Sequence, residues 1–346
     1  CIVVLGDLAF DQERIPAMPD VARIETSAPD TRNGTPNRGV VVPRFGDAGA
    51  LSLDHIPYPR VEGDDVVVRV RAASVNPVDW KIRNGDFPPV QRENLPVVLG
   101  RDLAGTVADR GPSVSDDVAT GDRIFAHIGF DRGAQADYVI VKSSELSTMP
   151  TTLDFAEAGA VPLAAMTAWQ GLFDHGGMTA GQRVLVHGGA GGVGMFAIQL
   201  AKAKGATVLT TAGADDLDFV RALGADTAID YRNGKFEDVA TDIDLVLDLI
   251  GGETRDRSWG VLKRGGILVS TLDQPDRAKA AAHGVRAAER WLAEPDAAQL
   301  GEIAALIDMG KVVVEIGETY SLTDVATAYD RQENGHVRGK IVLMMT

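Results

Sequence analysis

A glycine-rich stretch between two apolar runs constrains most strongly how this chain can fold. Residues 187–194 read HGGAGGVG, directly after the apolar residues 184–186 and directly before MFAIQLAKAKGA. Glycine gives up more conformational entropy on folding than any other residue, so five glycines in eight positions indicate that their backbone freedom is needed. The segment that fits the pattern G-x-G-x-x-G consists of Gly189, Ala190, Gly191, Gly192, Val193 and Gly194.

This pattern binds the phosphates of a dinucleotide when it joins a strand to a helix. Its glycines permit a tight turn, a close approach of the backbone to a pyrophosphate, and close packing of the helix on the strand. Free N–H groups at the start of the helix then hold the phosphates. The alternative is a merely flexible loop, but apolar strands and Ala- and Gly-rich helices alternate over residues 156–306. Such alternation predicts an α/β dinucleotide-binding domain with a doubly wound parallel sheet over these residues.

The rest of the chain reads differently. Residues 38–155 contain short β-branched runs separated by Gly, Pro or Asp, which predicts a largely antiparallel β domain. The segment 307–346 contains two further strand-like runs, KVVVEI and GKIVLMM, which we expect to rejoin that β domain. Residues 1–37 are rich in Pro, Asp, Arg and Thr, so we expect a poorly ordered N-terminal extension there.

Composition excludes several classes of function. The 346 residues suffice for two domains, and a net charge of −15 argues against a nucleic-acid or anionic-membrane surface. The single cysteine, Cys1, excludes an intramolecular disulfide and any metal site with several cysteines. No run approaches the ~18 apolar residues that a membrane span needs. We therefore expect a cytoplasmic protein.

The glycine stretch belongs to a longer motif. Residues 181–202, GQRVLVHGGAGGVGMFAIQLAK, resemble the quinone oxidoreductase, zeta-crystallin-like signature of the medium-chain dehydrogenase/reductase superfamily. Further ordered matches are SVNPVDWKIRNG (74–85), PVVLGRDLAGTV (96–107), AMTAWQGLF (165–173) and GKIVL (339–343). The resemblance covers about residues 38–346. It implies a GroES-like β domain for substrate, a Rossmann-type domain for NADPH or NADH, and a homodimer.

Many members of that superfamily bind zinc, but the ligands for it are missing from this sequence. A structural zinc site needs four Cys or His ligands, and one cysteine rules it out. The resemblance puts the usual first catalytic cysteine near Asn76, and the six histidines are scattered, which is typical of surface or supporting roles. Without a Lewis acid, conjugated acceptors suit hydride transfer best, because they spread the developing charge. We expect a zinc-independent reductase of quinones or α,β-unsaturated carbonyls.

The resemblance also implies site residues. Asn76 and Asp79 of the N-P-x-D stretch would face the nicotinamide, Asn76 as a donor to a substrate carbonyl and Asp79 as an orienting group. Lys81 is a second candidate donor to the carbonyl or enolate; the alternative is a solvated surface lysine. Thr167 matches a threonine near the nicotinamide.

The turn after the second strand of the 156–306 domain decides between NADPH and NADH. An acidic residue ending that strand would bind the ribose hydroxyls and repel a 2′-phosphate. This chain has Ala212 and Gly213 there, and Tyr231-Arg232 match a pair beside the 2′-phosphate of related NADPH enzymes. Asp215-Asp216 stand slightly further on, where Asp favours helix N-caps. The pattern favours NADPH over NADH.

Two other functions stay open from the sequence. An enoyl-thioester reductase would use a similar scaffold but would need a basic entrance for a CoA or pantetheine phosphate. The acidic composition of this chain does not indicate such an entrance. A cofactor-binding protein with a structural or interaction role would bind NADPH and reduce none of these substrates.

Overall fold

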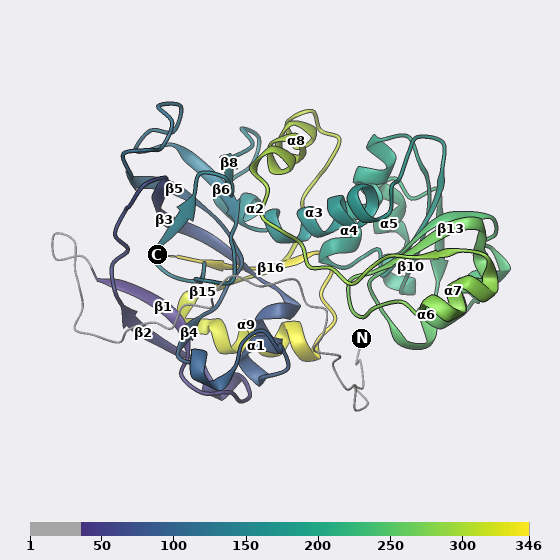
Figure 1. Ribbon diagram of the computed structural model, residues 1–346, viewed down its shortest axis with the longest axis horizontal. Helices are drawn as coiled ribbons and strands as arrows, with labels where there is room; N and C mark the ends of the chain where they lie inside the picture. The colour runs from purple at the N-terminus through teal and green to yellow at the C-terminus, as the bar shows by residue number, and fades with distance from the viewer. Residues whose placement is uncertain (1–35, 346) are drawn as a thin grey trace. The chain divides into compact units, whose positions relative to one another are not determined.

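Short β-branched runs build the first of two units in this computed structural model, which describes residues 36–345 (Figure 1). The unit comprises residues 36–163, 294–304 and 316–345. Its strands are β1 Asn37–Val42, β2 Ser52–Ile56, β3 Asp65–Val75, β4 Val97–Val98, β5 Asp102–Arg110, β6 Arg123–His127, β7 Tyr138–Lys142, β8 Leu146–Thr148, β15 Ile316–Ser321 and β16 Lys340–Met344.

Two sheets organise this unit. The larger has the order β15-β16-β3-β5-β6-β8, with β7 also paired to β3, and the smaller has the order β2-β1-β4. Every pairing in these sheets is antiparallel except β15 with β16. The β domain predicted to be largely antiparallel is therefore present. Its helices are α1 Pro77–Asn84, α2 Phe155–Gly159 and α9 Val325–Asn334.

Alternating strands and helices build the second unit, residues 164–293 and 305–315. Its strands are β9 Arg183–His187, β10 Thr207–Ala212, β11 Thr227–Asp230, β12 Ile243–Asp248, β13 Leu262–Ser270 and β14 Arg286–Ala287. Helices α4 Gly192–Ala203, α5 Leu217–Ala222, α6 Gly252–Ser258 and α7 Arg277–His283 lie within it, whereas α3 Pro162–Trp169 and α8 Ala297–Asp308 cross unit boundaries.

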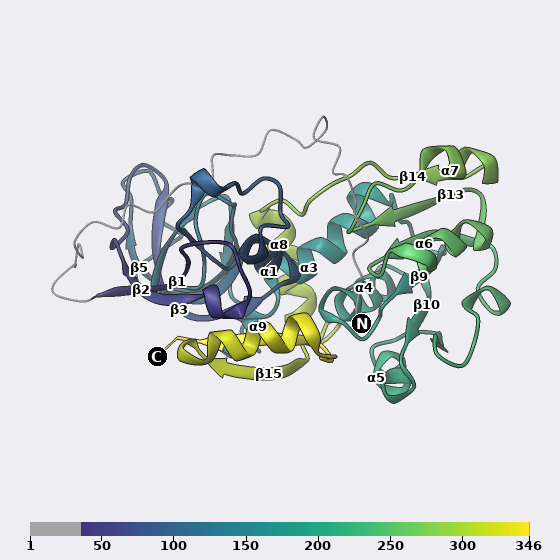
Figure 2. The same ribbon diagram turned by 90° about the horizontal axis from the view of Figure 1, so that it is seen from below.

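The sheet of this second unit is parallel throughout and has the order β11-β10-β9-β12-β13-β14. With β9 first along the chain, this is the doubly wound order 3-2-1-4-5-6 of dinucleotide-binding domains. The predicted fold class, a GroES-like β domain plus a Rossmann-type domain, is confirmed. The view in Figure 2 shows the strands β9, β10 and β13 with α6 and α7.

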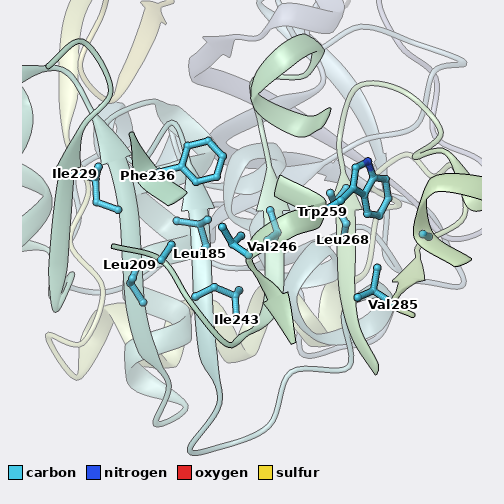
Figure 3. Close-up of a cluster of buried hydrophobic side chains, with 12 residues drawn as sticks. Leu185, Leu209, Ile229, Phe236, Ile243, Val246, Trp259, Leu268 and Val285 are labelled. Carbon is cyan, nitrogen blue, oxygen red and sulfur yellow. The ribbon is translucent and has the colours of Figure 1, made fainter. Parts of the chain in front are cut away.

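An apolar core fixes the second unit on one side of its sheet (Figure 3). Leu185, Leu209 and Val246 come from adjacent strands, and each is at most 2% exposed. Trp259, which follows α6, and Phe236 pack with them. Each such side chain contributes about 1.5–3 kcal/mol by burial, which holds the turns at the strand ends in place.

The unit boundaries differ from those expected at 155/156 and 306/307. The first unit extends to residue 163 and includes 294–304, where the Ala297 N–H donates to Ser144 O at 3.0 Å. Residues 305–315 belong to the second unit, because Gln199 bonds both the N–H and the carbonyl of Val313, at 2.7 and 3.0 Å. The same bonds explain why the expected strand over 311–316 is wrong up to residue 315.

The extension predicted over 1–37 lies outside the described residues as far as residue 35, and Asn37 already begins β1. Between residues 36 and 345, none of the helices has the length and apolar character that crossing a bilayer requires.

Candidate active site

Asn76 sits at the start of α1 and uses both ends of its amide. Its Nδ2 lies 3.2 Å from Ser74 Oγ and 3.2 Å from Asp102 Oδ1, to which it donates. Its Oδ1 accepts from Lys340 Nζ at 2.5 Å. Asn76 is 4% exposed, so these partners hold the amide in one orientation inside the first unit. We call Ser74, Asn76, Asp102 and Lys340 the α1 cluster.

Sheet register assembles the α1 cluster from three strands. Strand β16 pairs with β3 with Ile341 opposite Val75, which puts Lys340 beside the end of β3. Strand β3 pairs with β5 with Ala73 opposite Leu103, which puts Asp102 beside Ser74. The Asp102 carboxylate then accepts from the Ser74 hydroxyl at 2.8 Å and from the Ser74 N–H at 3.2 Å.

Asp102 and Lys340 were not predicted as site residues, although each places a charge in a mostly apolar stretch. Asp102 lies in LGRDLAG and Lys340 lies in GKIVLMM. That signal was available and indicates a buried partner of opposite charge. Burial lowers the pKa of the Lys340 ammonium, and Asp102 and Asp79 oppose that shift. A lysine that stays charged here depends on these carboxylates.

Asp79, on the first turn of α1, accepts a hydrogen bond from a backbone N–H group with each of its carboxylate oxygens. Oδ2 accepts from the Asn76 N–H at 2.9 Å, and Oδ1 accepts from the Gly100 N–H at 3.1 Å. Burial raises the pKa of Asp79 to about 6, against the pull of the Arg101 guanidinium. These bonds tie α1 to the loop before β5.

Lys81 lies on the same helix, half-buried, with Nζ 5.8 Å from the centroid of the Trp80 ring. Arg101 follows Gly100 and is buried over Phe130, its guanidinium carbon 4.9 Å from that ring centroid. Its Nη1 donates to Gly129 O at 2.7 Å. The first unit therefore brings Asn76, at the N-cap of α1, together with Asp79 and Lys81 on that helix, with the buried cations Lys340 beside Asn76 and Arg101 near Asp79.

The glycine turn between β9 and α4 has the geometry of a phosphate cradle. A Cβ on Gly189 would lie 2.1 Å from Thr210 Oγ1, and one on Gly194 would lie 2.2 Å from Gly188 O, so only glycine fits at either position. Helix α4 is capped at Gly191 with no side-chain hydrogen bond, which leaves its first N–H groups for a ligand. The cradle fits a pyrophosphate in charge and shape. Thr167, on α3, is half-buried.

The end of β10 lies next to the Tyr231-Arg232 pair. A Cβ on Gly213 would lie 3.8 Å from Arg232 Cζ and 3.9 Å from Tyr231 Cε1. The Arg232 guanidinium lies 5.5 Å from the centroid of the Tyr231 ring. Ala212 is buried at the end of the strand, whereas Tyr231 and Arg232 are exposed. Two segments nineteen positions apart thus share one surface.

Two histidines lie in the interior rather than at the surface. His127 is 2% exposed and His187 is fully buried. Burial lowers the pKa of His127 to about 3 and that of His187 to about 4, so both imidazoles are neutral near pH 7. Within residues 36–345, no three His, Cys, Asp or Glu side chains are grouped so that they could hold a metal ion.

Comparison with known proteins agrees with this arrangement. Residues 62–151 match the family described as "Alcohol dehydrogenase GroES-like domain", and residues 223–343 match "Zinc-binding dehydrogenase". The chain is 33% identical over 343 residues to "NAD(P)H oxidoreductase RTN4IP1, mitochondrial" of Danio rerio, covering 87% of each protein. It is 35% identical to "NADPH-dependent alkenal/one oxidoreductase, chloroplastic" of Arabidopsis thaliana, covering 86% of this chain and 77% of that protein.

A solved structure extends the likeness to three dimensions. The quinone oxidoreductase from Coxiella burnetii superposes with a TM-score of 0.82 at 33% identity, covering 90% of this chain and all of that one. Fold and site thus define a two-domain oxidoreductase that depends on NAD(P)H. The chain belongs to the medium-chain dehydrogenase/reductase family, in its zinc-independent quinone oxidoreductase branch.

Proposed function

We propose that this oxidoreductase takes NADPH in preference to NADH and reduces quinones or α,β-unsaturated carbonyls. The meeting of Gly213 and Arg232 at the end of β10 carries the cofactor preference. Gly213 offers no carboxylate to bind ribose hydroxyls, and the guanidinium lies 3.8 Å from where a Cβ would be. In this proposal Arg232 binds the 2′-phosphate, and the glycine turn with the N-terminus of α4 binds the pyrophosphate.

Two substitutions test the cofactor preference from opposite directions. Arg232→Ala should weaken NADPH binding about tenfold or more, because a charge-assisted contact is lost, and should leave NADH binding unchanged. Gly213→Asp adds a carboxylate beside Arg232 with van der Waals contacts of 3.8–3.9 Å, so the fold tolerates it. This substitution should weaken the binding of NADPH and strengthen the binding of NADH. Dissociation constants from cofactor fluorescence measure both.

Arg264→Ala is the matched control, since it removes an exposed arginine from β13 and changes the net charge equally. It should alter neither dissociation constant. Equal weakening of NADPH and NADH by Arg232→Ala would make this arginine structural and would remove the main support for NADPH.

The substrate class follows from the donors that the first unit offers. When bound, the reduced nicotinamide supplies a hydride, and a conjugated acceptor then becomes an enolate or a phenolate. Asn76 has both amide hydrogens engaged by Ser74 and Asp102, so we propose that it fixes the start of α1. Lys81, further along α1, is then the proposed donor to the developing oxyanion, and Asp79 orients the helix.

A panel of quinones, 2-alkenals and enones, assayed with NADPH and NADH side by side, tests the substrate class. We expect turnover of at least one class with NADPH. Tight NADPH binding with no turnover of any of them would contradict the proposal and favour a cofactor-binding protein. A homodimer and a cytoplasmic location are carried from the resemblance and composition; light scattering and cell fractionation check them.

A further inference from the structure

A buried row of polar side chains crosses the second unit at the carboxyl ends of its central strands. Thr211 of β10 and Asp248 of β12 both lie opposite His187 of β9, and Ser270 of β13 lies opposite Asp248. Each of these four side chains is at most 4% exposed. Ligands of doubly wound sheets bind outside this edge, so a buried row directly beneath it can shape the binding turn.

Hydrogen bonds connect part of this row to the glycine turn. The Gly188 N–H donates to Thr211 Oγ1 at 3.2 Å, and the Gly189 N–H donates to Thr211 O at 3.0 Å. Thr211 Oγ1 also lies 3.2 Å from His187 Nδ1. His187 Nε2 lies 2.9 Å from Ser258 Oγ, the last residue of α6, whose hydroxyl donates to Thr254 O at 2.7 Å.

The donor at one end, the Gly188 N–H, and the acceptor at the other, the Thr254 carbonyl, fix every proton between them. Ser258 has one hydroxyl hydrogen and gives it to a carbonyl, so it must accept from His187, and Nε2 carries the proton. Because burial lowers the pKa of His187 to about 4, the imidazole is neutral near pH 7 and Nδ1 is an acceptor. Thr211 then donates to Nδ1 and accepts from Gly188. We call Gly188, Thr211, His187, Ser258 and Thr254 the His187 series.

We propose that His187 is a positioning residue for the cofactor, which holds the glycine turn through Thr211 and couples it to α6 through Ser258. The proposal rests on the dinucleotide site proposed at that turn. Gly188 has a φ of +80° and its carbonyl accepts from the Gly191 N–H at 3.2 Å, so its peptide orientation sets the entrance to α4. A side chain that fixes Gly188 therefore fixes the phosphate-binding N–H groups.

Substitutions at the two ends test the coupling. Thr211→Val keeps the shape and removes the hydroxyl with its hydrogen bonds to Gly188 and His187, and it should weaken NADPH binding roughly 3–10-fold. Ser258→Ala acts on the far side of the imidazole and should weaken binding about 2–3-fold. The double variant should weaken it less than the product of the two, because both act through His187. Thr211→Ser keeps the hydroxyl, so it should bind NADPH with wild-type affinity.

Ser270→Ala is the matched control. Ser270 belongs to the same buried row, but its hydroxyl donates to Asp248 Oδ2 at 2.9 Å, outside the His187 series. It should lower the melting temperature of the cofactor-free protein and leave the dissociation constant for NADPH unchanged. Nitrogen NMR of His187 supplies a second readout that does not depend on cofactor: we expect the neutral Nε2–H tautomer in the wild type and a perturbed Nδ1 shift in Thr211→Val.

Three outcomes overturn the inference: an Nδ1–H tautomer, equal weakening by Ser270→Ala, or multiplicative effects of Thr211→Val and Ser258→Ala. A wild-type protein that binds neither NADPH nor NADH would instead overturn the proposed function. The tautomer measurement still stands in that case, so the two failures are distinguishable.

Discussion

Two buried polar clusters, one in each unit, follow different chemistry. The α1 cluster of the first unit places a carboxylate, Asp102, and an ammonium, Lys340, around one amide. The His187 series of the second unit joins hydroxyls, a neutral imidazole and backbone groups. A buried charge costs several kcal/mol to desolvate and is repaid only while its partner is in place, whereas a neutral hydrogen bond contributes about 1 kcal/mol. Loss of one member of the α1 cluster should therefore lower the stability of the first unit strongly. Each loss in the His187 series should lower the stability of the second unit by a smaller amount.

The largest expected effect comes from removing the carboxylate of the α1 cluster. Asp102→Ala removes one of the two carboxylates that support the buried Lys340 ammonium, and it takes away the acceptor of the Ser74 hydroxyl and one acceptor of the Asn76 amide. The free energy of unfolding should fall by about 3–5 kcal/mol, measured by urea denaturation. Asp248→Ala is the matched variant, since Asp248 is equally buried and accepts from the Gly251 N–H at 2.8 Å. It should cost about 1–3 kcal/mol, and equal losses would contradict the comparison.

The next effect is on turnover. Lys81→Met keeps the aliphatic stem and removes the ammonium, and it should lower kcat for enones by about 10²–10³ if that group stabilises the oxyanion. Quinones should be less affected, because aromatisation of the product already drives their reduction. Asn76→Ala should lower both kcat and the free energy of unfolding, since it takes apart the α1 cluster. NADPH affinity should change little in either variant.

Steady-state kinetics with NADPH and urea denaturation separate these two roles. If Lys81→Met and Asn76→Ala both turn over a true substrate at wild-type rates, the oxyanion contact lies elsewhere and the assignment of α1 is wrong.

Lowering the pH should also destabilise the two units to different extents, although the difference is smaller than for the substitutions above. His187 is neutral in the folded state down to about pH 4, while an unfolded histidine binds its proton below about pH 6.5, so stability falls as pH decreases through this window. At pH 5 this amounts to about 2 kcal/mol. His127 acts in the same direction in the first unit, with its pKa lowered to about 3.

Asp79 opposes that loss in the first unit. Its pKa is raised to about 6, above the unfolded value, so the folded state takes up the proton first and stability rises as pH falls from about 6 towards 4. The gain at pH 5 is about 1–1.5 kcal/mol. Hydrogen exchange resolved by residue should show the second unit losing protection first between pH 7 and pH 5. Earlier loss in the first unit would contradict these assignments.

The glycine turn, the α1 cluster and the His187 series differ in how far the sequence predicts them. The glycine turn is visible because its six residues are neighbours in sequence, and Gly189 and Gly194 are required for a local reason, such as the approach of Gly194 to Gly188 O. The α1 cluster depends on the register of β16, β3 and β5, which brings Lys340 next to Asn76 across 264 positions. No local pattern encodes that register, so Asp102 and Lys340 were recognised only as parts of motifs.

The His187 series is intermediate. His187 precedes the glycine turn and Thr211 ends the next strand, so both positions follow from the parallel alternation. Their burial does not, because it depends on packing by residues distant in sequence: the ring of Phe236 lies 4.7 Å from the imidazole of His187. The scattered spacing of the histidines predicted surface or supporting roles, and packing places His127 and His187 in the interior.

The smallest expected effect is none: prolonged chelation should leave activity unchanged. The carboxylates nearest Asn76 are already engaged, Asp79 by two N–H groups and Asp102 by Ser74 and Asn76. The Lys340 ammonium and the Arg101 guanidinium stand beside them, and two cations in a medium of low polarity repel a divalent ion strongly. Activity after dialysis against a chelator, together with the zinc content of the purified protein, measures this. Stoichiometric zinc, or lost activity that zinc restores, would mean that one of these two cations moves away to admit a metal, and the contrast between a charge-paired α1 cluster and a neutral His187 series would no longer hold.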